Sequence, residues 1–238
     1  MISEIGYFAI LLAFSLSLLQ ATVPLLGVFK NIIQWIDCYK PLAIAQAFLL
    51  LLAFLCLVIA FLENDFSLIY VVSNSNTDLP WYYKVSAVWG AHEGSFLLWA
   101  LIQSLWGFAV VISNNSMTKD FRALVTSILG VISSGFIAFI CFTSNPFEKI
   151  PFPPQSGSDL NPLLQDIGLI FHPPILYMGY VGFSVTFAFA LVSLIDQKFG
   201  ASWVEWSRRW TIYAWSFLTI GIALGSYWAY YELGWGGY

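Results

Sequence analysis

Long runs without a charged residue are the feature of this sequence that most restricts its fold. Twenty-five residues separate Glu4 from Lys30, 22 separate Lys40 from Glu63, and four further runs follow. About 20 apolar residues are enough for an α-helix to cross the hydrocarbon core of a bilayer. We therefore predict an all-α polytopic membrane bundle with six transmembrane helices, at about 5–29, 41–62, 94–113, 123–142, 173–195 and 210–231.

The composition agrees with a membrane protein. Hydrophobic residues make up 59% of the chain and charged residues only 9%, whereas a soluble domain has about 25% charged residues. A net charge of −4 argues against a basic nucleic-acid-binding protein. The first run is too long for a cleavable signal and begins with Glu4, so we expect it to remain as a helix. Because no linker long enough to form a separate soluble domain divides the runs, residues 1–238 are predicted to form a single transmembrane domain.

Lysine and arginine are distributed unevenly between the loops. The shorter loops, at 30–40, 114–122 and 196–209, contain seven of them, and the longer loops and the termini contain only Lys84 and Lys149. Positive residues favour the cytoplasmic side. We therefore predict that the long loops and both termini lie on the outer, periplasmic side.

Cysteine chemistry has little support in the sequence. Cys38, Cys56 and Cys141 are far apart, and no C-x-x-C motif is present. We interpret them as small apolar residues, because neither a disulfide framework nor covalent haem attachment to this chain fits their spacing.

Two histidines lie where predicted outer loops meet predicted helices. His92 and Glu93 precede the third span, where a carboxylate near a helix N-terminus is favoured and a structural capping role is the simpler interpretation. His172 is followed by Pro173 and Pro174, which we expect to open the fifth span because proline suits the first turn of a helix. A histidine at this rim could ligate a metal or could be structural. Met178, deeper and on another helix face, is not expected to be a second ligand.

The sixth predicted span ends in an unusual aromatic cluster. Six of the twelve residues from Tyr227 to Tyr238 are aromatic and three are glycine. Such a cluster suits rings stacked around a flat ligand, although an enlarged interfacial belt would also contain aromatic residues. Gly221 and Gly225 form a small-xxx-small pattern that favours close packing against another helix.

Three segments together resemble one protein family. They are residues 87–95 (AVWGAHEGS), 160–180, which contains Asp166, His172 and the two prolines, and 225–237. The chain resembles the N-terminal part of the CcmF/NrfE family, the haem-lyase subunits of c-type cytochrome maturation, within the wider haem-handling group that has a tryptophan-rich signature.

The resemblance implies a function and a site. Haem b would be held at the outer face by two axial histidines, with His172 as the first iron ligand. Gly234 to Tyr238 would open the tryptophan-rich signature, so that residues 227–238 begin the haem-handling segment. Around the porphyrin we expect a group of four aromatic residues, namely Tyr227, Trp228, Tyr231 and Trp235. The implied reaction is the attachment of haem to the cysteine thiols of apocytochrome c. The implied partners are the haem chaperone, apocytochrome c and other maturation subunits of the bacterial or mitochondrial inner membrane.

The sequence departs from the family pattern at its end. The rest of the signature, the second outer histidine and the further spans of the family do not occur before Tyr238. We therefore expect a fragment or one piece of a split protein, inactive without the remainder of the polypeptide or a split partner chain. Two alternatives stay open: an NrfE-type subunit dedicated to a nitrite reductase cytochrome, and a polytopic solute or haem transporter. Against a transporter, no predicted span contains Asp, Glu, Lys or Arg, and the two halves show no repeat.

Overall fold

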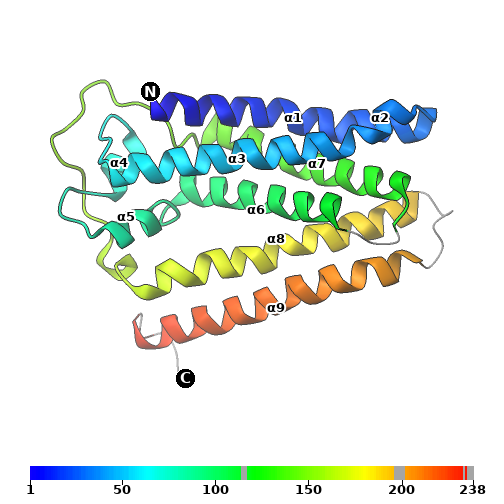
Figure 1. The fold of residues 1–238 in the computed structure, drawn as a ribbon. Helices are drawn as coiled ribbons and strands as arrows, with labels where there is room; N and C mark the ends of the chain where they lie inside the picture. Colours follow the sequence, from blue (N-terminus) through cyan, green and yellow to red (C-terminus); the bar gives the residue numbers. More distant parts are fainter. Residues whose placement is uncertain (114–116, 196–201, 233, 235–238) are drawn as a thin grey trace.

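The structure is a computed structural model that describes residues 1–113, 117–195, 202–232 and 234. Its long helices lie side by side along a common direction (Figure 1). They are α1 (Ile2–Lys30), α3 (Tyr39–Leu62), α6 (His92–Ile112), α7 (Lys119–Thr143), α8 (Ile167–Ile195) and α9 (Ser202–Tyr231). The shorter ones are α2 (Ile33–Asp37), α4 (Ile69–Asn74), α5 (Trp81–Ala87) and the 3-10 turn η1 (Pro162–Leu164).

The predicted all-α membrane architecture is confirmed. Within the described residues, six helices are long and apolar enough to cross a membrane, with α2 and α3 counted as one continuous candidate over Ile33–Leu62. Most extend a few residues beyond the predicted limits, because the polar residues that flank an apolar run can continue a helix.

The prediction that Pro173 and Pro174 open the fifth span is wrong. Helix α8 begins at Ile167 and contains both prolines in its interior. Asp166 starts the helix instead: its carboxylate accepts a hydrogen bond from the Gly168 amide at 2.6 Å, and its carbonyl accepts one from the Leu169 amide at 3.1 Å. This capping satisfies amides that have no partner inside the helix. His172 therefore lies more than one turn inside α8 and not at its first residue.

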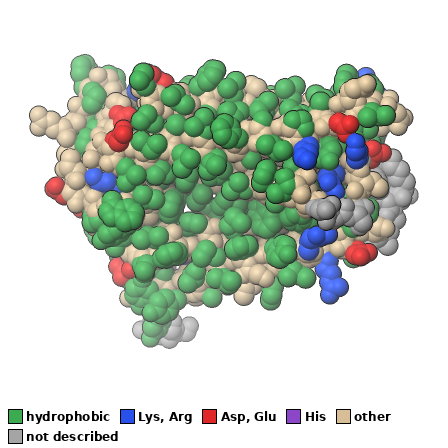
Figure 2. Space-filling model, viewed as in Figure 1, with side chains coloured by type: hydrophobic (Ala, Val, Ile, Leu, Met, Phe, Trp, Pro, Cys, Tyr) green, Lys and Arg blue, Asp and Glu red, His purple; other side chains and the backbone are tan. Residues whose placement is uncertain are grey.

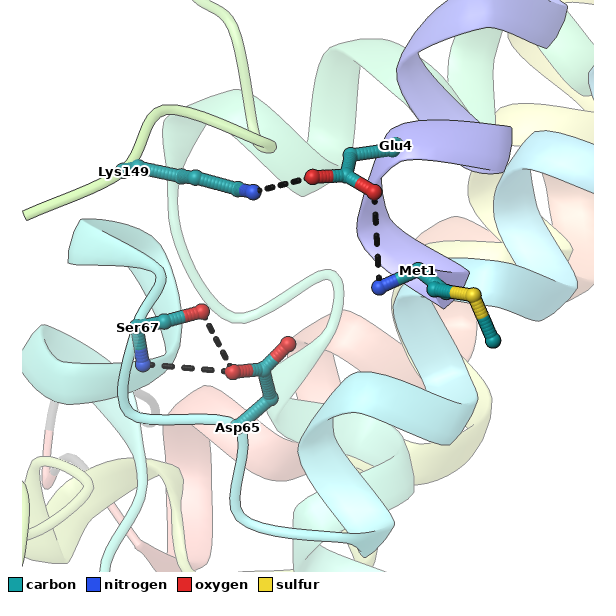
Figure 3. Close-up of polar contacts among 5 residues, drawn as sticks. All are labelled: Met1, Glu4, Asp65, Ser67 and Lys149. Atoms are coloured by element: carbon teal, nitrogen blue, oxygen red, sulfur yellow. Dashed lines mark hydrogen bonds and ion pairs between the residues drawn. The ribbon is translucent and has the colours of Figure 1, made fainter.

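The long connections gather at one end of the bundle, which we call the loop end. The start of α1, the end of α9, α4 and α5 lie there, and α2 lies at the opposite end (Figure 1). The segment after α7 is held to this end by Lys149, whose Nζ contacts Glu4 Oε1 of α1 at 2.7 Å (Figure 3). Two backbone hydrogen bonds, from Ile69 to Glu148 and from Ile150 to Ser67, tie the same segment to the connection before α4. In that connection Asp65 accepts hydrogen bonds from Ser67 (Figure 3).

The surface also differs between the loop end and the opposite end of the bundle. Hydrophobic side chains cover the middle of the face in Figure 2, and most of the lysine and arginine visible there lies at the end opposite the loop end. This is the separation that alternating membrane crossings produce, and the side of the membrane that the loop end faces stays a prediction.

Helix α9 lies at the edge of the bundle. The core has one cluster around Leu57, Phe61 and Leu97 and another around Phe121 and Phe189. Helix α9 packs along α8 and buries the smallest share of its length among the six long helices of the described chain. Its position and that of any site on it therefore depend mainly on α8.

Candidate functional site

Glycines bring α8 and α9 into backbone contact. A Cβ added to Gly179 of α8 would lie 2.2 Å from the Leu218 nitrogen, and one added to Gly221 of α9 would lie 2.6 Å from the Leu176 Cα. No side chain larger than hydrogen fits at these distances. The prediction that Gly221 belongs to a close helix–helix contact is confirmed, and the partner helix is α8.

The close approach places His172 against the backbone of α9. Its Nδ1 lies 2.9 Å from the carbonyl oxygen of Gly221. A carbonyl oxygen only accepts hydrogen bonds, so Nδ1 donates, and the neutral ring then keeps an unshared electron pair on Nε2. Metal-ligating histidines typically donate their other ring N–H to such a carbonyl or to a carboxylate, which fixes the tautomer and the ring orientation.

Gly225 provides the space for the imidazole. A Cβ at this position would lie 2.4 Å from His172 Cε1 and 2.9 Å from both ring nitrogens. The small-xxx-small pattern of α9 thus has two uses: Gly221 packs on the α8 backbone and accepts the histidine proton, and Gly225 leaves room for the ring.

A cavity of about 220 Å³ opens beside His172. Four of the five predicted site residues line it, and the fifth, Trp235, lies outside the described residues. Its lining is Ile167, Gly168, Phe171, His172, Leu224, Tyr227, Trp228 and Tyr231. Cavities that enclose a whole small molecule usually measure about 300–1,000 Å³. This one has the size and the apolar, aromatic walls to take the edge of a flat ring system, with the rest of the ring outside it.

The aromatic walls are held by local contacts. The rings of His172 and Trp228 lie 6.0 Å apart at 60°, and those of Tyr227 and Tyr231 lie 4.9 Å apart. Trp228 also requires Gly168, whose added Cβ would lie 2.5 Å from the indole Cγ.

Asp166 links α8 to α9 at the loop end, a role that the sequence interpretation missed. Besides capping α8, its carboxylate accepts a hydrogen bond from the Tyr231 hydroxyl at 2.6 Å. One carboxylate therefore joins the first turn of α8 to the last turn of α9. The Asp-x-Gly pattern before an apolar run is a helix N-cap signal and could have revealed the first half of this role.

Helix α5 lies beside this acidic corner. Burial raises the pKa of Tyr83 in α5, and the neighbouring Tyr82 and the carboxylates of Asp166 and Glu232 raise it further. The carboxylates of Asp166 and Glu232 thus lie near the aromatic residues of α5.

The other predicted histidine, His92, does not line this cavity. It is the first residue of α6, its Nδ1 shares a hydrogen bond with Ser144 Oγ at 3.2 Å, and its ring meets Phe96 and Phe139 edge-on. A Cβ added to Gly94 would overlap the carbonyl of Val88, so the chain enters α6 through a turn too tight for a side chain at this position. Among the described residues, no group of three or more His, Cys, Asp or Glu could hold a metal ion.

Comparison with known proteins decides the family. The sequence model of the family described as "Cytochrome C assembly protein" matches residues 89–238. The chain belongs to this family.

Its relatives within the family include CcmF and NrfE proteins. Over its whole length the chain is 56% identical to the cytochrome c-type biogenesis protein CcmF of Pseudomonas aeruginosa and 52% identical to that of Escherichia coli, covering 36% and 37% of them. It is 46% identical to the protein NrfE of Haemophilus influenzae, covering 38%. A solved structure named "Cytochrome c Heme Lyase CcmF" superposes on the whole chain with a TM-score of 0.87 and 31% identity. The chain covers 38% of that structure, so it spans little more than a third of the proteins it matches.

Proposed function

We propose that this chain is the N-terminal, haem-holding part of a haem-lyase subunit in cytochrome c-type biogenesis. The observation that carries the proposal is the His172–Gly221 hydrogen bond beside an aromatic cavity, in a chain of this family. The haem, a b-type haem, is the substrate. The chain would be an inner-membrane protein with its loop end on the outer side.

The reaction requires positioning more than proton transfer by the protein. Each apocytochrome thiol adds across one haem vinyl group, so that sulfur bonds to one carbon and hydrogen to the other. The addition needs no net oxidant, and holding the porphyrin against the two thiols supplies most of what a protein can contribute.

The residues of the site have separate tasks in this proposal. His172 Nε2 binds the iron on one side, and Tyr227, Trp228 and Tyr231 shelter the edge of the ring. Trp235 is proposed to extend the same wall, and residues 227–238 to begin the tryptophan-rich segment. The second axial ligand comes from the remainder of the polypeptide or from a split partner chain.

The loop end is proposed as the side where other proteins dock. Apocytochrome c must reach the vinyl edge of the haem, and the cavity lies between the parts of α8 and α9 nearest this end. The haem chaperone and further membrane subunits of cytochrome c maturation complete the proposed set of partners. A general CcmF-type role is preferred to a dedicated nitrite reductase role because the CcmF relatives above are more similar than the NrfE relative. The family match argues against a solute transporter.

The test replaces His172 with glycine in the complete protein that contains this chain. We expect the variant to accumulate in membranes but to retain less haem and to yield less mature cytochrome c. Added imidazole, which can occupy the space of the missing ring, should restore part of both. Unchanged haem content and cytochrome yield in His172→Gly would refute the ligand role.

A further inference from the structure

Helix α8 runs through a position where it cannot make a backbone hydrogen bond. In an α-helix the amide of residue 173 would donate to the carbonyl of Leu169. Residue 173 is proline, which has no N–H, and it lies inside the helix. Loss of this bond costs stability and bends a helix unless another group takes the amide's place. The affected carbonyl lies three residues before His172.

The missing donor is replaced by a side chain from another part of the fold. Trp89, which precedes α6, donates a hydrogen bond from its indole Nε1 to the Leu169 carbonyl at 2.8 Å. This is the acceptor that Pro173 leaves without its amide. Trp89 and Leu169 are 80 residues apart in the sequence, so the bond connects the body of the bundle to the first turns of α8.

Trp89 is itself firmly placed. Its carbonyl accepts a hydrogen bond from Ser95 Oγ at 2.8 Å, and its ring stacks on Phe54 with centroids 6.3 Å apart and planes at 15°. Trp89 and Phe54 both pack against both core clusters. The indole therefore presents its N–H to α8 from the junction of the two clusters.

We propose that Trp89 is a positioning residue for His172. Its indole N–H stands in for the amide missing at Pro173 and so holds the proline-containing turns of α8, with His172, at a fixed place on the bundle. Because α9 is placed mainly by α8, the same bond sets the cavity between the two helices. The inference deepens the proposed function and rests on it.

The chain contains a matched control in Trp106. Its indole Nε1 also donates to a backbone carbonyl of α8, that of Met178, at 3.1 Å. In an α-helix the Met178 carbonyl accepts a hydrogen bond from the amide of residue 182. Residue 182 is glycine, whose backbone N–H is available for this bond. Trp106 therefore adds a bond to a satisfied carbonyl, whereas Trp89 replaces one that proline removed.

The experiment uses the full-length protein with haem and compares Trp89→Phe with Trp106→Phe. We expect Trp89→Phe to weaken haem binding by about five- to tenfold, as loss of a buried hydrogen bond implies, and to lower the axially ligated fraction in the iron spectrum. Hydrogen exchange over residues 168–176, measured with and without haem, should become faster in this variant. Trp106→Phe should leave the ligated fraction and this exchange close to wild type.

The decisive comparison repeats Trp89→Phe in Pro173→Ala protein. There residue 173 again has an amide that can donate to the Leu169 carbonyl. In Pro173→Ala protein the further change Trp89→Phe should alter haem binding and exchange by less than about twofold. A role of Trp89 in packing alone would give the same loss in both backgrounds and overturn the proposal, as would equal losses in Trp89→Phe and Trp106→Phe. If His172→Gly keeps normal iron ligation, the proposed function fails, and the exchange of residues 168–176 still shows whether Trp89 anchors α8.

Discussion

The two histidines of this chain show how surroundings decide what a residue can do. Both belong to long helices near the loop end of the bundle. The partner of His172 Nδ1 is a carbonyl, which accepts only, so the proton lies on Nδ1 and Nε2 is left with its electron pair. The partner of His92 Nδ1 is the Ser144 hydroxyl, which can donate or accept, so either tautomer is compatible with it.

The two histidines also differ in the room around their rings. Gly225 leaves room for the His172 ring beside a cavity, whereas His92 meets the edges of Phe96 and Phe139. A ligand must approach the unprotonated nitrogen of a ring that is held still, and only the surroundings of His172 provide a fixed tautomer and an adjoining cavity. We therefore infer different roles for the two residues: iron ligation for His172, and a structural role at the start of α6 for His92.

The strongest test of this contrast replaces each histidine with alanine. Loss of a group that merely orients a metal ligand typically lowers affinity 10- to 100-fold, and loss of the ligand itself costs more. We expect His172→Ala to reduce haem affinity by roughly 100-fold or more and His92→Ala to change it by less than about threefold. Haem titration of the purified full-length variants measures both. Similar losses in the two variants would remove the distinction.

A second test changes the room around His172 and leaves the histidine in place. In Gly225→Ala the new methyl group would lie 2.4 Å from the imidazole, so the ring must move and its bond to Gly221 must break. We expect haem affinity to fall by roughly tenfold, the lower value for loss of an orienting partner. The iron spectrum should show a smaller axially ligated fraction.

Gly135 of α7 is the matched control for this substitution. A Cβ there would meet nothing within 4 Å, and alanine is favoured over glycine inside a helix by about 1 kcal/mol. Gly135→Ala should therefore keep haem affinity and slightly raise thermal stability. If Gly225→Ala behaves in the same way, the His172 ring does not need the space that Gly225 provides.

The link between Asp166 and Tyr231 is expected to have a smaller effect. Tyr231→Phe removes the hydroxyl that donates to the capping carboxylate but keeps the ring that lines the cavity. Because this hydrogen bond is exposed, water competes with it, and about 1 kcal/mol is a reasonable upper value. We expect a loss of haem affinity of about threefold to fivefold. Tyr230→Phe, on a neighbouring exposed tyrosine that does not line the cavity, should have no effect, and an equal loss there would show that Asp166 is not the reason.

Much of this architecture can be predicted from the sequence because the determining signals are local. Six charge-free runs indicate six helices, and their limits lie within a few residues of the observed ones except at the starts of α8 and α9, which begin six and eight residues earlier than predicted. The aromatic residues of α9 are close in the sequence. Their shared location beside His172 could therefore be predicted from the helical repeat and from the packing of one neighbouring helix. The start of α8 was predicted wrongly because proline favours a first turn, whereas the Asp166 cap and the Trp89 indole allow the helix to begin six residues earlier.

The hydrogen bonds that orient His172 and α8 differ from these local signals, because they join residues far apart in the sequence. The Gly221 carbonyl is 49 residues from His172, and Trp89 is 80 residues from Leu169. No periodicity or motif encodes which carbonyl a histidine or an indole reaches across the bundle, because that depends on how close the helices pack. That four of the predicted residues line one cavity could be expected from the sequence, whereas the tautomer of His172 could not; their role in binding haem stays a prediction.

The smallest expected effect concerns the hydroxyl beside His92. Ser144→Ala removes the partner of His92 Nδ1 without touching the cavity between α8 and α9. Because Ser144 does not line the cavity, we expect its loss to change the free energy of haem binding by less than about 0.5 kcal/mol, which corresponds to roughly twofold. We expect haem affinity and cytochrome c yield to stay within that range, although the exchange of amides at the start of α6 should rise as His92 loses a restraint. A larger loss of haem would mean that the tautomer of His92 matters as much as that of His172, and the two histidines would then have to be treated as one functional pair.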